Sequence, residues 1–187
     1  MKLNSLARIS LAAMVTILPA TLPAQNTVTV QQVALEKESF ELIDQIEDVA
    51  RSVHNNTDAL RMHASRNMSR WTNAHHLMQV KDLVNNGLNP ALNRLTEIQP
   101  QLPGWEQHAL DRMFESARTL ATDTNSAILN LNDNGSAPIV MNDEYRAFLD
   151  RMDEHAKNLA STADAAGDYA DALNQALEVG LNVPSQK

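Results

Sequence analysis

The feature that most constrains the fold is a long apolar repeat between residues 142 and 177. Its apolar residues recur at alternating steps of three and four, which is the spacing of one face of an α-helix. This apolar stripe consists of Tyr145, Leu149, Met152, Ala156, Leu159, Ala163, Ala166, Ala170, Leu173 and Leu177. A helix with one such stripe has to bury it against other elements. Three more segments carry the same pattern, which predicts an all-α, up-and-down antiparallel four-helix bundle.

The first segment is expected to form one helix from residue 30 to about residue 66. Its apolar residues include Val33, Phe40, Ile43, Ala50, Val53, Leu60, Ala64 and Met68. Residues 55–58 interrupt the pattern with side chains that compete for backbone hydrogen bonds, so a break capped by Asn56 or Thr57 is the alternative. The apolar spacing continues through this run and favours a continuous helix.

The second helix is expected after a turn, with Ser69 or Thr72 as its N-cap. Its stripe consists of Leu77, Val80, Val84, Leu88, Leu92, Leu95 and Ile98. Gly87 and Pro90 fall inside this stripe. Because proline lacks a backbone donor and crowds the carbonyl four residues earlier, we expect the helix to kink there or to restart with Asn89 as its cap. The stripe stays in phase in both cases and predicts one bent element.

The third helix is expected to begin near Trp105, because residues 99–104 hold two prolines and a glycine and predict a connection. Its stripe consists of Ala109, Met113, Ala117, Leu120, Thr124, Ile128 and Leu131. Residues 132–138 are rich in Asn, Asp, Gly and Pro and predict the turn that ends it.

The last helix carries recognisable signals at both ends. Asn142 is its expected N-cap, and Asp143 and Glu144 lie in the first turn, where the helix dipole favours negative charge. Gly180 and Pro184 predict its stop.

The first 24 residues have the layout of a secretory signal peptide. Lys2 and Arg8 give a basic start, an apolar run follows at residues 9–18, and small residues precede Ala24. The apolar run is about half the roughly 20 residues that span a bilayer. We therefore predict cleavage after Ala24, no stable membrane insertion afterwards, and a single helical-bundle domain at residues 25–187 that is periplasmic or secreted.

Composition excludes several classes of function. The sequence has no cysteine, which excludes disulfides, thiolate metal sites, thiol catalysis and a lipid anchor. Loss of Lys2 and Arg8 would leave 13 basic side chains against 23 acidic ones, a net charge of −10. Because no cluster of Lys and Arg opposes this charge, the chain repels phosphate backbones, and we expect no nucleic-acid partner.

Signatures of catalysis are absent from the sequence. No histidine has a glutamate three residues before it, which excludes a ferritin-like di-iron site, and neither His-Glu-x-x-His nor a nucleophile or phosphate-loop motif occurs. Adjacent carboxylates such as Asp153 and Glu154 point in different directions on a helix and are usually solvated. We therefore predict a protein that is not an enzyme, and assign no catalytic, cofactor-binding or metal-binding residues.

Methionine and histidine nevertheless gather in two places. Residues 62–78 contain Met62, His63, Met68, His75, His76 and Met78, and Met152 lies one turn before His155. These side chains suit copper, and a Met and His pair can hold haem iron. The simpler interpretation is that the methionines fill gaps in the core while His54, His108 and the other histidines lie on the surface.

Trp71 begins the most distinctive local string, which continues to His75 and His76. One interpretation places Trp71 at the rim of the bundle, where it stacks on a ligand that both histidines contact. The interpretation that we prefer has Trp71 closing the end of the bundle as a plug.

Three classes of function remain. The first, which we favour, is an exported envelope, stress or adaptor protein that works through protein–protein contacts on its acidic outer helices. The second is a periplasmic carrier or sensor for copper or haem, and the third, by analogy of fold alone, is a ligand-binding sensory module. Inward-facing His75 or His155 would favour the carrier, whereas exposed histidines and an apolar core would favour the first class. The sequence leaves the partner, the ligand and the oligomeric state open.

Overall fold

In the computed structural model, the described residues are 30–134 and 138–178, and they are almost entirely helical, with no strand in these two ranges. The α-helices are α1 (Val30–Ser65), α2 (Arg70–Leu83), α3 (Asn89–Ile98), α4 (Gly104–Asp133) and α5 (Asp143–Glu178). The shorter segments are the π-helical turn η1 (Val84–Leu88) and the 3₁₀ turns η2 (Gln99–Gln101) and η3 (Ile139–Met141). Because α2, η1 and α3 are continuous, the fold has four long helical segments. The prediction of an all-α fold is confirmed.

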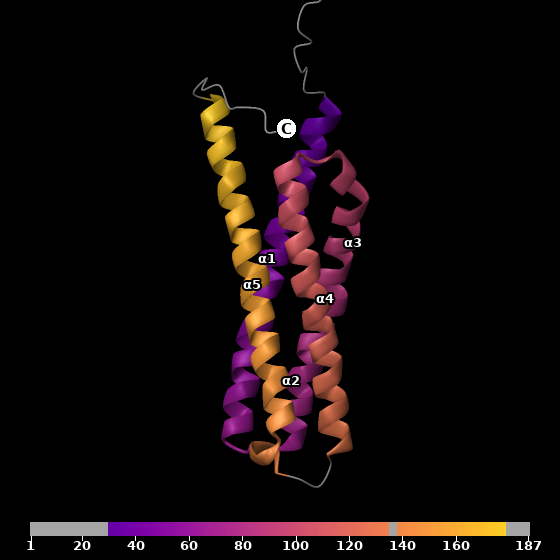
Figure 1. Ribbon diagram of the computed structural model, residues 1–187, viewed down its shortest axis with the longest axis vertical. Coiled ribbons are helices and arrows are strands. Elements are labelled where there is room, and N and C mark those ends of the chain that lie inside the picture. Colours follow the sequence, from indigo (N-terminus) through magenta and orange to yellow (C-terminus); the bar gives the residue numbers. More distant parts are fainter. Residues whose placement is uncertain (1–29, 135–137, 179–187) are drawn as a thin grey trace, which may run out of the picture.

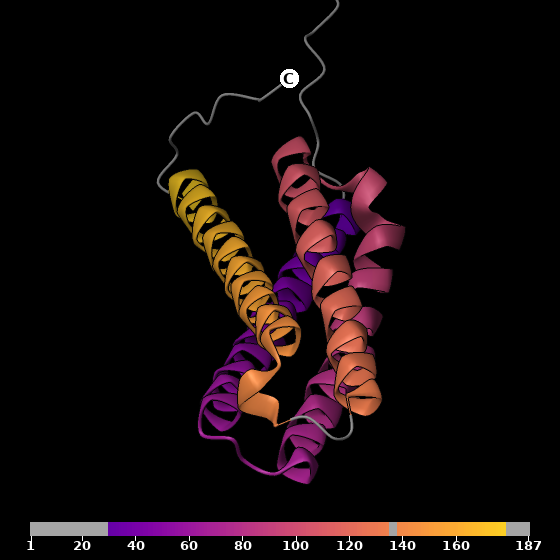
Figure 2. The same ribbon diagram turned by 60° about the horizontal axis from the view of Figure 1, so that its bottom comes forward.

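The four segments lie side by side along the long axis of the molecule (Figure 1). α1 packs against α5, α2 and α3, and α4 packs against α5 and α2. Figures 1 and 2 both show α5 leaning away from α4 toward its C-terminal end. We call the end that holds η2 the upper end and the end that holds η3 the lower end, as in Figure 1.

Helix α1 is continuous through residues 55–58, as predicted. The hydroxyl of Thr57 donates to the carbonyl of Val53 at 2.6 Å, and the amide of Asn56 donates to the carbonyl of Ser52 at 2.9 Å. The polar side chains therefore bond to their own helix one turn earlier. This local bonding leaves the helix continuous.

The turn before α2 is capped by Ser69, one of the two predicted residues. The Ser69 side chain accepts a hydrogen bond from the backbone N–H of Thr72 at 3.2 Å. Asn67 adopts a left-handed conformation with φ of 50°, which Asn tolerates better than most residues. These two residues fix the point at which the chain leaves α1.

The second helical segment stays helical past Pro90. The backbone N–H of Asn89 donates to the carbonyl of Val84, five residues earlier, and Asn89 itself has right-handed helical dihedrals. A restart capped by Asn89 is therefore wrong, because a π-helical turn accommodates the proline instead. All seven residues of the predicted stripe are buried. A Cβ atom on Gly87 would lie 2.9 Å from the Val49 side chain, so glycine permits the close approach of α1.

The core is built from the predicted stripes, except that Val33 and Met68, at the two ends of the first stripe, are exposed and that the buried positions shift slightly at the ends of α4. Leu110 and Ala127 are buried there, whereas the predicted Ala109 and Ile128 are half-buried beside them. The predicted cap of α5 is confirmed, since the side-chain oxygen of Asn142 accepts from the backbone N–H of Tyr145 at 2.9 Å.

No helix in the described ranges is both long enough and apolar enough to cross a bilayer. The predicted signal peptide at residues 1–24 and the predicted stop at Gly180 and Pro184 lie outside the described residues.

Candidate functional site

A row of aromatic and imidazole rings lies across α1 and α2 near the lower end. The Trp71 indole stacks on His75 with ring centroids 5.6 Å apart and 7° between the planes. The ring centroids of His75 and His76 are 5.8 Å apart, and those of His76 and His63 of α1 are 4.8 Å apart. We call His63, His75 and His76 the histidine cluster. The fold thus brings together three histidines from the predicted 62–78 segment.

The environment of His76 favours its neutral imidazole. Burial lowers the pKa of His76 below its ordinary value of 6.5, and the nearby His63 and His75 lower it further. The buried Nδ1 atom of His63 has no hydrogen-bond partner. Nδ1 of His76 lies 3.5 Å from the side-chain oxygen of Asn56. The facing pair of His63 and His76 can therefore offer nitrogen lone pairs, although no group of three or more His, Asp or Glu in residues 30–134 and 138–178 is arranged to hold a metal.

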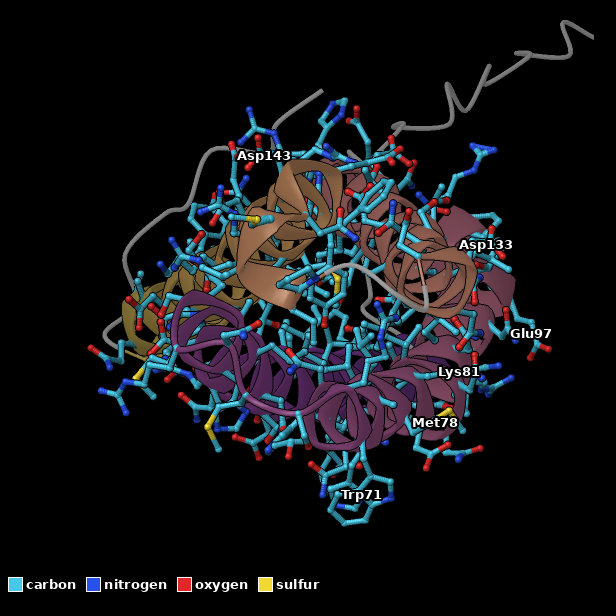
Figure 3. The ribbon with its side chains drawn as sticks, turned by 90° about the horizontal axis from the view of Figure 1, so that it is seen from below. Trp71, Met78, Lys81, Glu97, Asp133 and Asp143 are labelled. Atoms are coloured by element: carbon cyan, nitrogen blue, oxygen red, sulfur yellow. The ribbon has the colours of Figure 1, made fainter. Side chains whose placement is uncertain are left out.

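Trp71 projects away from the bundle, as Figure 3 shows from below. Its side chain is 76 % exposed, so the preferred interpretation of Trp71 as a plug is wrong. The reason lies in the geometry of the helix. Asn73 is buried on the core side of α2, and Trp71, two positions earlier, lies about 200° away around the helix axis and so faces outward. Asn73 itself fills this end of the core and accepts a hydrogen bond from the Tyr145 hydroxyl at 3.4 Å.

The methionines divide into two groups. Met62, Met68 and Met78 are exposed, so the interpretation that they fill the core is wrong for these three. Met152 is fully buried, as the stripe predicts. His155 is half-buried one turn away, with Nε2 3.8 Å from a carboxylate oxygen of Asp123 on α4 rather than in the core beside Met152. The remaining two histidines lie apart, His54 beside Asp153 and His108 exposed on α4.

The sequence pattern did not predict a buried ionic cluster on α5. Asp153, which we expected to be solvated like Glu154, is buried and accepts from Lys157 Nζ at 2.8 Å and Arg61 Nη1 at 3.2 Å. Nδ1 of His54 lies 2.6 Å from its other oxygen. Burial raises the pKa of Asp153, but the hydrogen bonds from Lys157 and His54 outweigh burial and hold the pKa below 3.8. This cluster ties α5 to α1.

A second ionic cluster ties α5 to α4. Arg151 donates from Nη2 to the buried Asp123 at 2.9 Å, and its guanidinium lies 4.8 Å from the centroid of the Phe148 ring. These charges are directed at partners within the bundle. They therefore serve the packing of α5.

Glu106, at the start of α4, is a buried acid that sequence patterns gave no sign of. It is 1 % exposed, and burial raises its pKa to about 7. The Ser39 hydroxyl donates to Glu106 Oε2 at 2.9 Å and also lies 2.8 Å from the carbonyl of Glu36. Since one hydroxyl proton cannot serve both acceptors fully, a protonated Glu106 that donates to Ser39 satisfies all three groups. Oε1 of Glu106 and Nε1 of the neighbouring Trp105 are buried without partners.

Two open grooves of more than 600 Å³ adjoin α5. One, of about 690 Å³, lies between the end of α1 and the start of α5 and is crossed by the ion pair of Arg61 Nε and Asp150 at 2.7 Å. The other, of about 620 Å³, lies between α4 and α5 in the upper half and includes Trp105 and Tyr169 in its wall. The charged side chains that line the first groove pair with one another, whereas the second groove is more accessible to a ligand.

Comparison with known proteins assigns no family to this chain. No protein-family model matches it, and no curated protein and no solved structure shows significant similarity.

Proposed function

We propose that the chain is an exported, non-enzymatic protein that works through protein–protein contacts made by the outer face of α2 at the lower end. In this proposal the helices form an up-and-down antiparallel bundle whose second helix is kinked near Gly87 and Pro90. Residues 1–24 are removed as a signal peptide. The observation that carries the proposal is the exposure of Trp71.

The exposed side chains of α2 line up on one face. Trp71, His75 and Met78 are spaced at i, i+4 and i+7, and Figure 3 shows Trp71 and Met78 at the outside of the bundle. Met68 is exposed in the turn just before them. Trp and Met are enriched in protein interfaces, and a cluster of exposed apolar side chains marks an interaction surface. The Trp71 face, as we name these four residues, therefore suits a partner with an apolar pocket.

Charge supports a protein partner over nucleic acid or an anionic membrane. The chain has a formal net charge of −8, with 23 acidic against 15 basic side chains. This charge repels phosphate-rich surfaces. A partner whose pocket has a basic rim would complement it.

A photo-crosslinking experiment tests the contact. A benzophenone amino acid at Trp71 should give one dominant protein adduct in cells, whereas the same amino acid at Leu129, which is 62 % exposed on α4, should not. With the partner purified, Trp71→Ala should weaken the measured Kd by at least about tenfold, as expected for a buried tryptophan anchor. Leu129→Ala should leave it unchanged. Equal adducts at both positions, or a Kd indifferent to Trp71→Ala, would contradict the proposal.

Export has its own test. Mass spectrometry of the purified protein should find Gln25 as its first residue, in an extracytoplasmic fraction. An intact Met1 on protein that stays in the cytoplasm would reject export without bearing on the Trp71 face.

The second candidate is a copper carrier, favoured by the facing pair of His63 and His76. Two imidazoles 4.8 Å apart, one with a free buried nitrogen, are suitable copper ligands. Metal content, an absorption spectrum and copper titration should then show stoichiometric binding that His63→Asn abolishes and His108→Asn preserves. Haem loading belongs in the same experiment, because a Soret band lost in His155→Ala would instead support haem. Protein that binds neither would reject the carrier.

A further inference from the structure

We propose that the upper groove between α4 and α5 binds a small amphipathic anion, a monocarboxylate with an apolar body. This site lies away from the Trp71 face and does not depend on it. The proposal rests on the shape of the groove, its aromatic wall and the cations on its rim.

The groove exists because small side chains face it from both helices. Its lining includes Ala109 of α4 and Thr162, Ala165 and Ala166 of α5. The groove lies at the level where α5 leans away from α4 (Figure 2). The resulting 620 Å³ falls within the range of about 300–1,000 Å³ that is usual for ligand sites.

One end of the groove is an aromatic wall. The rings of Trp105 and Tyr169 lie 4.6 Å apart at 56°, and Phe40 of α1 stacks behind Trp105 at 6.4 Å. Tyr169 is exposed, so part of this aromatic surface meets solvent. Covering such a wall with an apolar group is favourable, because it removes apolar surface from water.

The rim supplies two basic side chains from one face of α4. His108 and Arg112 are one turn apart, and neither makes a hydrogen bond or ion pair with any residue in the described part of the chain. The carboxylate of Asp111, also on the rim, accepts from the Gln99 amide at 2.9 Å. The unpaired guanidinium is thus the group on this rim best placed to receive an anion.

These features specify the chemistry of the ligand. A carboxylate can form a bidentate pair with Arg112 while its apolar body lies over the alanines and against Trp105. A neutral ligand of the same shape keeps only the apolar contact. An alkylammonium ion would be repelled by the same guanidinium.

The test uses Trp105 as the reporter, in full-length mature protein carrying Trp71→Phe. The probes are decanoate, 1-decanol and decyltrimethylammonium, each kept below its micelle concentration. Decanoate should change Trp105 fluorescence saturably and bind more tightly than the other two. Arg112→Gln should weaken decanoate about tenfold and leave decanol unchanged. Arg118→Gln, a matched change elsewhere on α4, should alter neither.

A second variant separates loss of the site from loss of the fold. Ala165→Leu fills the groove and should abolish the response while circular dichroism stays unchanged. The proposal is overturned by a non-saturable response, by equal affinity for the three probes, or by an Arg112→Gln protein that binds decanoate normally. It is also overturned if Tyr169→Ala dissolves a dimer seen in sedimentation, because the groove then receives a second copy of the chain.

Discussion

The two halves of α5 carry the same apolar periodicity and pack in different ways. In the lower half the core positions are Tyr145, Leu149 and Met152, all fully buried. In the upper half the buried positions beyond Leu159 are alanines, namely Ala163, Ala166 and Ala170. Large side chains draw the helices into one dense core, whereas alanines leave α4 and α5 apart around a groove. Periodicity therefore determines which side of a helix faces inward, and side-chain size determines what that side encloses.

Polar groups sharpen the contrast. At the lower end Asn130 donates to Glu144 and accepts from Asn142, both at 2.7 Å. At the upper end buried atoms of Glu106 and Trp105 lack partners. Of the three buried side-chain atoms without a partner in the described residues, two therefore lie at the upper end, and the third, Nδ1 of His63, lies near the lower end.

The largest expected effect tests the packing contrast directly. Leu149→Ala should cost about 3 kcal/mol of unfolding free energy, because a fully buried leucine leaves a cavity in a dense core. Ala165→Leu should cost less than about 1 kcal/mol, because Ala165 is exposed and lines the open groove. Urea denaturation followed by circular dichroism measures both. Similar costs for the two variants would mean that the halves are packed alike.

Removing the buried charge of Asp153 should come next, at about 2–3 kcal/mol for Asp153→Asn at pH 7. The folded pKa lies below the ordinary 3.8, so the carboxylate stabilises the protein above that pH and its contribution is lost as pH falls through the folded value. Urea midpoints of both proteins should therefore converge under strong acid. A constant difference down to pH 2 would assign the loss to packing. Asp150→Asn, on an exposed pair with Arg61, is the control and should cost much less.

The upper half should respond to pH in the opposite direction. Because the pKa of Glu106 is about 7 in the folded protein and 4.5 ordinarily, stability should fall as pH rises from 4.5 to 7 and stay lower above it. Glu106→Gln can still donate to Ser39, so it should be near neutral at pH 5 and stabilising by about 2 kcal/mol at pH 8. Glu115→Gln, an exposed change on the same helix, should alter neither value. A Glu106→Gln protein that is equally destabilised at both pH values would show that Glu106 is held as a carboxylate.

The smallest effect concerns the histidine cluster. His76 should titrate below pH 6.5, because its ring is partly buried and lies near His63 and His75. NMR of the imidazole protons measures this pKa. His63→Asn removes one neighbouring imidazole and should raise the pKa, whereas His108→Asn should not. A normal pKa in the unaltered protein would mean that the rings are separated in solution.

The sequence was sufficient for the elements of the fold and for most of the core. Stripes and caps predicted the four segments, including the continuity of α1 and the cap at Asn142, because backbone hydrogen bonding and apolar spacing are local. The burial of Asp153 was not predictable in this way. Its partners Arg61 and His54 are about one hundred positions away, and only the folded chain brings them together.

Trp71 shows the limit of prediction from the sequence for the candidate site. The string around it is distinctive, yet we expected Trp71 to close the end of the bundle. Extending the phase of the α2 stripe backward from Leu77 to Asn73 would have placed Trp71 on the opposite face. The signal for its exposure was therefore present in the spacing.

The π-helical turn at Val84–Leu88 has a consequence for the length of the chain. Such a turn holds one residue more than an α-helix would over the same rise, while the faces before and after it keep their direction. Deleting Asn85 would therefore leave Leu92 and Leu95 facing the core, provided that Pro90→Ala restored the missing donor. Loss of a residue inside a helix normally rotates everything beyond it by about 100°. Here the second helix already contains the spare residue, so this is the place where the chain can become shorter and keep its inward face.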